Sequence, residues 1–258
     1  MTTTDSIASH RVLLELCAAS ADDVATAVAA SVDRIELNSA FPLGGLTPTL
    51  PLLEAAVARF SGPVITMIRP REGGFTYSST ERRQMYREAE LLLSCGAAGI
   101  AVGFLTADFA IDDAECRSLR ETFPNATLVF HRAFDLCDNL MDAGQALVDC
   151  GFNRILTGGG TSAAVDGIVV LTELIRRLGG DIEVLPAGGI RAGNVARIVS
   201  ETGAVQIHSA ARGSTTLRTP QRNGRPLSDF ADWTSYSHTS AEILNALRKE
   251  LDRLEQAQ

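Results

Sequence analysis

The chain has 258 residues, of which 45% are hydrophobic, and a formal net charge of −8 at pH 7. This acidic balance argues against nucleic acid or an anionic membrane as the main partner. No apolar stretch approaches the ~20 residues of a membrane span, and the first ten residues do not have the pattern of a signal peptide. The five cysteines are never spaced C-x-x-C, which favours reduced thiols in a cytoplasmic protein over disulfides or a structural zinc site.

A short apolar strand and an amphipathic helix alternate eight times along most of the chain. Strands rich in Val, Ile and Leu are typical of parallel strands that are buried on both faces. Eight such units in one run predict an α/β protein with a single (β/α)8 domain, a TIM barrel. The expected strands are Val12–Cys17, Asp33–Asn38, Val64–Arg69, Gly99–Phe104, Thr127–Arg132, Asn153–Gly158, Ile182–Ala187 and Val205–Ala210.

One domain, residues 1–258, accounts for the whole sequence, with a barrel core at about 12–213. Residues 214–238 are polar and are expected to form a long loop, either a lid over the barrel or a disordered segment. Leucines at helical spacing in 239–256 predict a C-terminal helix that covers the outside of the barrel.

Polar residues recur where the expected strands end. Side chains alternate between the two faces of a strand, and the outward positions are apolar, so the polar ones must point into the barrel. The chemistry of such barrels lies at the C-terminal ends of the strands. The inward polar set expected to meet there is Glu15, Cys17, Glu36, Arg69, His131 and His208.

This set supports two interpretations. Buried carboxylates need partners, so Glu15, Glu36, Arg69 and His208 could form a purely structural ion-pair network. Their convergence at the barrel mouth instead favours a catalytic site for acid–base chemistry. The candidate catalytic residues are Glu15, Glu36, Arg69, His131, Asp135 and His208. Glu15, Glu36, His131 and His208 are also plausible ligands of a divalent metal ion.

A second cluster, His131-Arg132-Ala-Phe-Asp135, follows the fifth strand. Asp135 is expected to orient His131 and to fix its tautomer. The alternative is a simple loop salt bridge between Arg132 and Asp135.

Small residues follow the sixth, seventh and eighth strands, and barrels often bind phosphate at the loops after the seventh and eighth. Small residues allow main-chain N–H groups to approach an anion, although glycine also simply permits tight turns. No nucleotide cofactor is evident. The candidate ligand- or anion-binding residues are Arg132, Thr157, Gly158, Gly159, Gly188, Gly189, Ser209 and Arg212.

Several phrases of the sequence resemble the CutC copper-homeostasis family. The resemblance implies a cytosolic barrel, a homo-oligomer (dimer or tetramer), an association with copper tolerance and binding of Cu(I), with no settled reaction. The matching phrases are LELCAAS (Leu14–Ser20), DRIELNSA (Asp33–Ala40), GGLTPT (Gly44–Thr49), MIRPREGGFTYS (Met67–Ser78), FHRAFD (Phe130–Asp135), RILTGGG (Arg154–Gly160), AGGI (Ala187–Ile190) and IHSAARG (Ile207–Gly213).

This chain departs from the family at Asn38, where a cysteine is common. Two thiolates would suit Cu(I) better than Cys17 alone with Met67 as a thioether. Three functions therefore stay open. They are a copper-homeostasis protein that binds Cu(I) through Cys17, a lyase, isomerase or hydrolase that acts on a small anionic or sugar-like metabolite, and a non-catalytic ligand sensor.

Overall fold

The computed structural model of the chain describes residues 11–218, 221–223, 225–226 and 234–256. Strands and helices alternate along the chain as the sequence predicts. The strands of the main sheet are β1 (Leu13–Ala18), β2 (Arg34–Leu37), β3 (Val64–Met67), β4 (Gly99–Val102), β5 (Thr127–Phe130), β6 (Arg154–Thr157), β7 (Glu183–Pro186) and β8 (Gln206–Ser209). The helices are α1 (Ala21–Ala29), α2 (Leu50–Arg59), α3 (Ser79–Ser94), α4 (Asp113–Thr122), α5 (Leu140–Asp149), α6 (Ile168–Leu178), α7 (Ala192–Thr202) and α8 (Ala241–Gln256).

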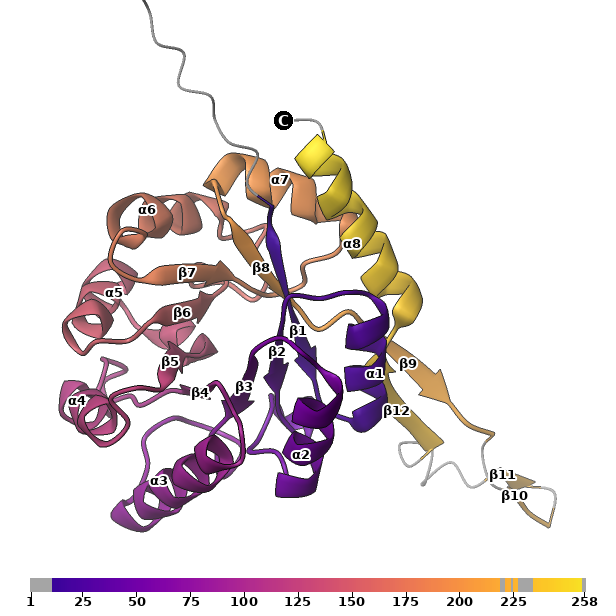
Figure 1. Cartoon of the computed structure of the whole chain (residues 1–258), viewed down its shortest axis with the longest axis horizontal. Helices are drawn as coiled ribbons and strands as arrows, with labels where there is room; N and C mark the ends of the chain where they lie inside the picture. Colours follow the sequence, from indigo (N-terminus) through magenta and orange to yellow (C-terminus); the bar gives the residue numbers. More distant parts are fainter. Residues whose placement is uncertain (1–10, 219–220, 224, 227–233, 257–258) are drawn as a thin grey trace, which may run out of the picture.

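The eight strands form one parallel sheet in the order β7-β6-β5-β4-β3-β2-β1-β8. Strands β7 and β8, at the two ends of this order, lie next to each other, so the sheet is a nearly closed barrel inside a ring of helices (Figure 1). The predicted (β/α)8 single domain is confirmed. Most strands are shorter than expected, because the residues at their ends leave the ladder and enter the loops that build the barrel mouth.

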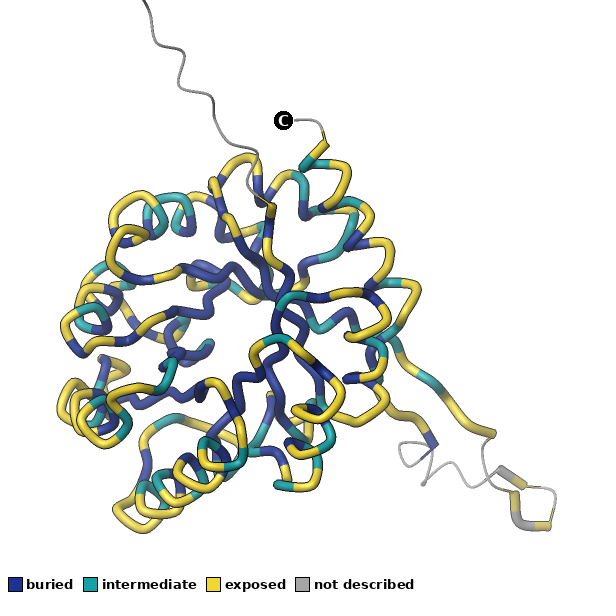
Figure 2. The backbone as a smooth tube through the Cα atoms, viewed as in Figure 1, coloured by how far each residue is buried: buried dark blue, intermediate teal, exposed yellow. Residues whose placement is uncertain are grey.

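The barrel has two separate apolar cores. The larger core lies between the outer face of the sheet and the helices, and the barrel strands are almost entirely buried (Figure 2). The smaller core fills the inside of the barrel with side chains from β3 to β7 and from the residue after β7. Its members are Ile65, Met67, Ala101, Val129, Leu156, Leu185 and Ala187. Because apolar side chains fill the middle of the barrel, polar side chains can gather only at its two ends.

Local capping explains where several helices begin. The Ser20 hydroxyl accepts a hydrogen bond from the Asp23 N–H at the start of α1, and Ser78 forms a capping box with Glu81 at the start of α3. Asp112 caps α4 in the same way as Ser20 caps α1. These caps satisfy N–H groups that the helices leave without intrahelical partners.

The segment 214–238, expected as a loop, carries regular structure in its described part. Strand β9 (Arg212–Thr216) pairs antiparallel with β12 (Ser235–Thr239), and together they project from the barrel (Figure 1). The short strands β10 (Gln221–Arg222) and β11 (Arg225–Pro226) pair beyond them. Trp233, which belongs to the same expected loop, lies outside the described residues.

Helix α8 packs against the barrel as expected, with its buried leucines facing inward. Leu244, Leu247 and Leu251 are fully buried, and α8 lies beside α7. None of the helices in the described part of the chain is long and apolar enough to cross a membrane.

Candidate functional site

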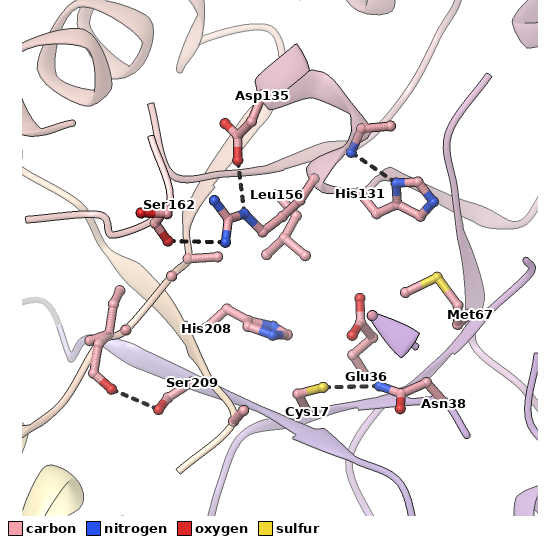
Figure 3. A pocket seen from close by; sticks show the side chains of 18 of the residues that line it. Cys17, Glu36, Asn38, Met67, His131, Asp135, Leu156, Ser162, His208 and Ser209 are labelled. Carbon is pink, nitrogen blue, oxygen red and sulfur yellow. Dashed lines mark hydrogen bonds and ion pairs between the residues drawn. The ribbon is translucent and has the colours of Figure 1, made fainter. Parts of the chain in front are cut away.

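A cavity of about 650 Å³ lies at the C-terminal ends of the strands. Its walls come from strand ends and from the loops that follow them (Figure 3). The predicted site residues that line it are Cys17, Glu36, Arg69, His131, Arg132, Asp135, Gly188, Gly189, His208 and Ser209. Glu15, Thr157, Gly158, Gly159 and Arg212 do not line it. Ten of the predicted residues therefore converge on one cavity at the barrel mouth, and the other five do not reach it.

Glu15 is buried next to His208. Strand register places Glu15 opposite both Arg34 on β2 and His208 on β8. One carboxylate oxygen lies 2.7 Å from His208 Nδ1, and the other accepts a hydrogen bond from Arg34 Nε. Burial alone would raise the pKa of Glu15, but the hydrogen bond with His208 and the charge of Arg34 lower it to about 2. Glu15 is therefore an ionised anchor for His208.

Arg34 continues this network into the barrel interior. Its guanidinium also donates to Gln206 Oε1 at 2.8 Å, and Gln206 donates to Glu183 Oε2 at 3.1 Å. Arg154 completes the layer by its ion pair with Glu183. These side chains form a hydrogen-bonded ionic layer at the N-terminal ends of β2, β6, β7 and β8, on the other side of the apolar interior core from the cavity.

Cys17, Glu36 and His208 form a compact buried group. One candidate ligand atom of each lies within 4.8 Å of the other two. Burial raises the pKa of Cys17 and of Glu36. Burial would lower the pKa of His208, but hydrogen bonds with Cys17 and Glu15 and the charge of Glu36 raise it well above its usual value. Glu15 and His131, expected as further ligands, do not belong to this group.

Asn38 lies beside the Cys17 thiol, in the place where a second cysteine would lie. Its Nδ2 donates a hydrogen bond to Cys17 Sγ over 2.9 Å (Figure 3). The sulfur of Met67 also borders the cavity. The compact donor set for a soft metal is therefore one thiol and one imidazole, with the carboxylate of Glu36 alongside.

Arg69 does not join the ionic network that the sequence predicts. Its Nη1 donates to the carbonyl oxygens of Leu43 and Gly45, and its Nη2 donates to that of Gly73. The network prediction is wrong because the loops after β2 and β3 fold over the guanidinium and supply these acceptors. Arg69 is buried and holds the two loops together. Within the described chain it forms no ion pair with a carboxylate.

The predicted contact between Asp135 and His131 is also wrong. His131 Nδ1 accepts a hydrogen bond from the N–H of Ala133 at 3.1 Å. Asp135 instead accepts from Arg132 Nε at 2.8 Å, so the alternative loop salt bridge is the one that forms. The reason is the short helix η2 (Arg132–Leu136), which turns the Asp135 side chain toward the loop after β6.

The glycine-rich loop after β6 already holds an anion, the carboxylate of Asp135. The N–H groups of Gly158 and Gly160 and the hydroxyl of Thr157 all donate to Asp135 Oδ1, over 3.1, 3.0 and 2.5 Å. Gly159 N–H donates to the Thr157 hydroxyl. The main-chain cradle predicted here is real, but its N–H groups position the Arg132–Asp135 pair instead of facing an external ligand.

Two other predicted anion ligands have partners within the fold. Arg212 forms an ion pair with the buried Asp23 at 2.7 Å, which attaches β9 to α1. The Ser209 hydroxyl donates to the carbonyl of Ile190 at 2.9 Å and accepts from Ala211 N–H at 3.2 Å. Of the predicted anion ligands at the ends of β7 and β8, Gly188, Gly189 and Ser209 border the cavity.

Sequence reasoning missed Arg191 and Arg34. Arg191 follows Gly188-Gly189-Ile190 and lines the cavity directly before α7. The sequence signal that could have found Arg191 is a cation directly after the Gly188-Gly189-Ile190 turn at the end of β7. Arg34 lies two residues before Glu36 on the same strand face, and that spacing could have placed it inside the barrel.

Comparisons with known proteins agree with the fold. The model of the CutC family matches residues 12–213. A CutC family protein of Treponema denticola is 40% identical over 198 residues, which cover 77% of this chain and 80% of that protein. The human copper homeostasis protein cutC homolog is 38% identical over 207 residues, 80% of this chain and 76% of that protein.

A solved structure of a CutC protein has the same fold. The crystal structure of the putative copper homeostasis protein CutC from Streptococcus agalactiae superimposes with a TM-score of 0.73 at 29% identity. The superposition covers 77% of this chain and 98% of the other. The chain belongs to the CutC family, a family associated with copper homeostasis.

Proposed function

We propose that the barrel mouth is the active site of an enzyme that acts on a small anionic metabolite. The observation that carries this proposal is an excess of positive charge in the cavity of an acidic protein. The charged residues of the cavity wall are Glu36, Arg69, Arg132, Asp135, Arg191 and His208.

Pairing removes most of these charges. Arg132 is neutralised by Asp135, and His208 is paired with Glu15, which lies outside the cavity wall. Neither Arg69 nor Arg191 forms an ion pair with a carboxylate in the part of the chain that the structure describes. Burial lowers the pKa of Arg191, as expected for a cation that has lost water without gaining a counter-charge. A dianion would supply that counter-charge.

The size of the cavity favours a metabolite over a bare ion. Pockets for small organic ligands typically measure about 300–1,000 Å³, and this cavity measures about 650 Å³. Glu36 and His208 border it and are suited to proton transfer. In this proposal Arg191 and Arg69 attract the anion while Glu36 and His208 move protons on it.

Phosphoglycolate, a small anionic probe that carries a phosphate and a carboxylate group, tests the proposal by calorimetry. We expect it to bind the protein, and Arg191→Ala to weaken binding by about 10–100-fold, since a charged hydrogen bond contributes about 1.5–3 kcal/mol. Arg197→Ala is the matched control, because Arg197 lies on α7 in an exposed ion pair with Glu201. Equal affinity for the Arg191 variant and the unmodified protein, or no binding at all, would contradict the proposal.

The compact group of Cys17, Glu36 and His208 favours a second candidate, binding of Cu(I) as cargo. The Cys17 thiolate, the His208 imidazole and the Met67 thioether suit this soft ion, and Glu15 anchors His208 as carboxylates anchor metal-binding histidines. Asn38 supplies no second thiolate, and the raised pKa of Cys17 means that binding must displace a proton.

Competition with a Cu(I) chelator tests this second candidate. We expect Cys17→Ser to remove most Cu(I) binding and Asn38→Cys to strengthen it, because the second variant gives two neighbouring thiols. Tight stoichiometric binding that survives Cys17→Ser would rule out the thiol as the ligand. Cys95→Ser is the control, since Cys95 lies at the end of α3.

A further inference from the structure

The hydrogen bond at Nδ1 determines the tautomer of His131. Nδ1 accepts from the N–H of Ala133, so it carries no proton (Figure 3). A neutral imidazole then carries its single proton on Nε2. Protonating Nδ1 as well would bring two N–H groups face to face, and the geometry therefore opposes the cationic form of His131.

The surroundings of His131 also disfavour the cationic form of its ring. The ring is 4% exposed and contacts the ring of Phe75 at a centroid distance of 5.0 Å. The guanidinium carbon of Arg69 lies over the same Phe75 ring, 5.0 Å from its centroid. Burial, followed by the charge of Arg69, lowers the pKa of His131 to about 3.

The other nitrogen, Nε2, has no hydrogen-bond partner among the described residues, although it is buried. Burying a donor without a partner is unfavourable, and buried donors in folded proteins nearly always have one, so this N–H requires an explanation. His131 lines the cavity, on a different wall from Cys17 and Glu36 (Figure 3). The acceptor for Nε2–H is therefore to be sought on the molecule that the cavity binds.

The position of the ring is built into the barrel by Gly103, the residue after β4. A Cβ atom at this position would lie 2.2 Å from His131 Cε1 and 2.6 Å from Nδ1. No larger side chain fits without displacing the imidazole. Glycine at position 103 therefore leaves the space that the imidazole of His131 occupies.

From this geometry we infer that His131 Nε2–H donates a hydrogen bond to a carbonyl oxygen of the substrate, which is therefore a small anion that carries an aldehyde or ketone. The inference rests on the proposed function and names its substrate class. A neutral histidine that polarises a carbonyl is a known device in enzymes that form enediolates.

The corresponding step is proton abstraction next to the carbonyl. The Glu36 carboxylate takes the proton from the carbon beside the carbonyl, and the C–H electron pair becomes a C=C bond. The carbonyl π pair moves to oxygen, where His131 Nε2–H and the charge of Arg69 stabilise it. Return of the proton to the same carbon regenerates the substrate. Where that carbon carries a hydroxyl group, return of the proton to the former carbonyl carbon, with transfer of the hydroxyl proton to the former carbonyl oxygen, gives the isomer, and no oxidant or reductant is needed.

The tautomer can be measured without any ligand. The chain has four histidines, and nitrogen NMR of isotope-labelled histidine distinguishes their ring forms. We expect the His131 signal, assigned through the loss of one signal in His131→Gln, to remain in the neutral Nε2–H form from pH 8 to about pH 4, well below the unperturbed histidine value. An Nδ1–H tautomer, or titration close to that unperturbed value, would overturn the inference.

Dihydroxyacetone phosphate serves as the carbonyl probe. We expect infrared spectra to show a weakened C=O bond in the bound probe, and this shift to disappear in His131→Phe and persist in His131→Gln, which keeps an N–H donor. Exchange of the probe's carbon-bound protons with solvent should fall by about 10²–10³-fold in His131→Phe. His238→Phe, on β12 outside the cavity, is the control.

The outcomes separate this inference from the proposed function. If phosphoglycolate binds but the carbonyl of dihydroxyacetone phosphate is not polarised, or is polarised equally in His131→Phe, the cavity binds anions and the role of His131 is wrong. If neither probe binds while His131 keeps the Nε2–H tautomer, the proposed function fails at anion recognition.

Discussion

Replacing Glu36 with glutamine will lower turnover by about 10²–10⁴-fold, the usual contribution of a general acid–base residue. The amide keeps the shape of the side chain and its hydrogen-bonding capacity but cannot accept the proton. Glu36 is buried and borders the cavity, so its charge acts directly on the bound molecule. Binding of phosphoglycolate should change far less than turnover. The measurement is steady-state turnover of the anionic metabolite that a substrate screen identifies.

Glu54→Gln is the matched control, because Glu54 is an exposed glutamate on α2. A Glu36→Gln variant that folds normally and keeps full activity would show that the acid–base assignment is wrong. Under the Cu(I) hypothesis the same substitution should leave the affinity for Cu(I) almost unchanged, since a carboxylate is a poor ligand for a soft ion.

The second large effect concerns stability. Arg34→Met should lower the free energy of unfolding by about 3–5 kcal/mol, because it leaves the buried Glu15 carboxylate without its main cationic partner. Arg34 and Glu15 have side-chain exposures of only 8% and 4%, so water cannot replace the lost interaction. Denaturant-induced unfolding followed by circular dichroism measures the change.

Arg197→Met provides the comparison, since exposed ion pairs contribute only about 0–1 kcal/mol. In the double variant Arg34→Met/Glu15→Gln, much of the lost stability should return, because the uncompensated charge is gone. Equal unfolding free energies for Arg34→Met and Arg197→Met would contradict the structural role given to the buried layer.

The fold was predictable because the hydrophobic pattern of the strands and helices repeats regularly along the chain. Eight apolar strands that alternate with helices determine a parallel barrel, and strand alternation alone places Glu36, His131 and His208 in one cavity. This information is local along the chain, so a single sequence contains it.

The wrong contact predictions for Arg69 and Asp135 both involve loops. The carbonyl groups that hold Arg69 and the N–H groups that surround Asp135 belong to main chain whose course depends on tertiary packing. Side-chain identity does not reveal which main-chain groups a loop will present. Arg34 was missed for a different reason, since an arginine within a strand is usually solvent-exposed, whereas here strand register pairs it with Glu15.

A crystal structure of the protein with phosphoglycolate would show where an anion binds, on which the proposed function depends. We expect the ligand to lie inside the barrel mouth, with its anionic groups near Arg191 and the Gly188-Gly189 turn and an oxygen within hydrogen-bond distance of His131 Nε2. Phosphoglycolate bound only outside the cavity, or a mouth filled by a metal ion on Cys17 and His208 that leaves no room for it, would contradict the account.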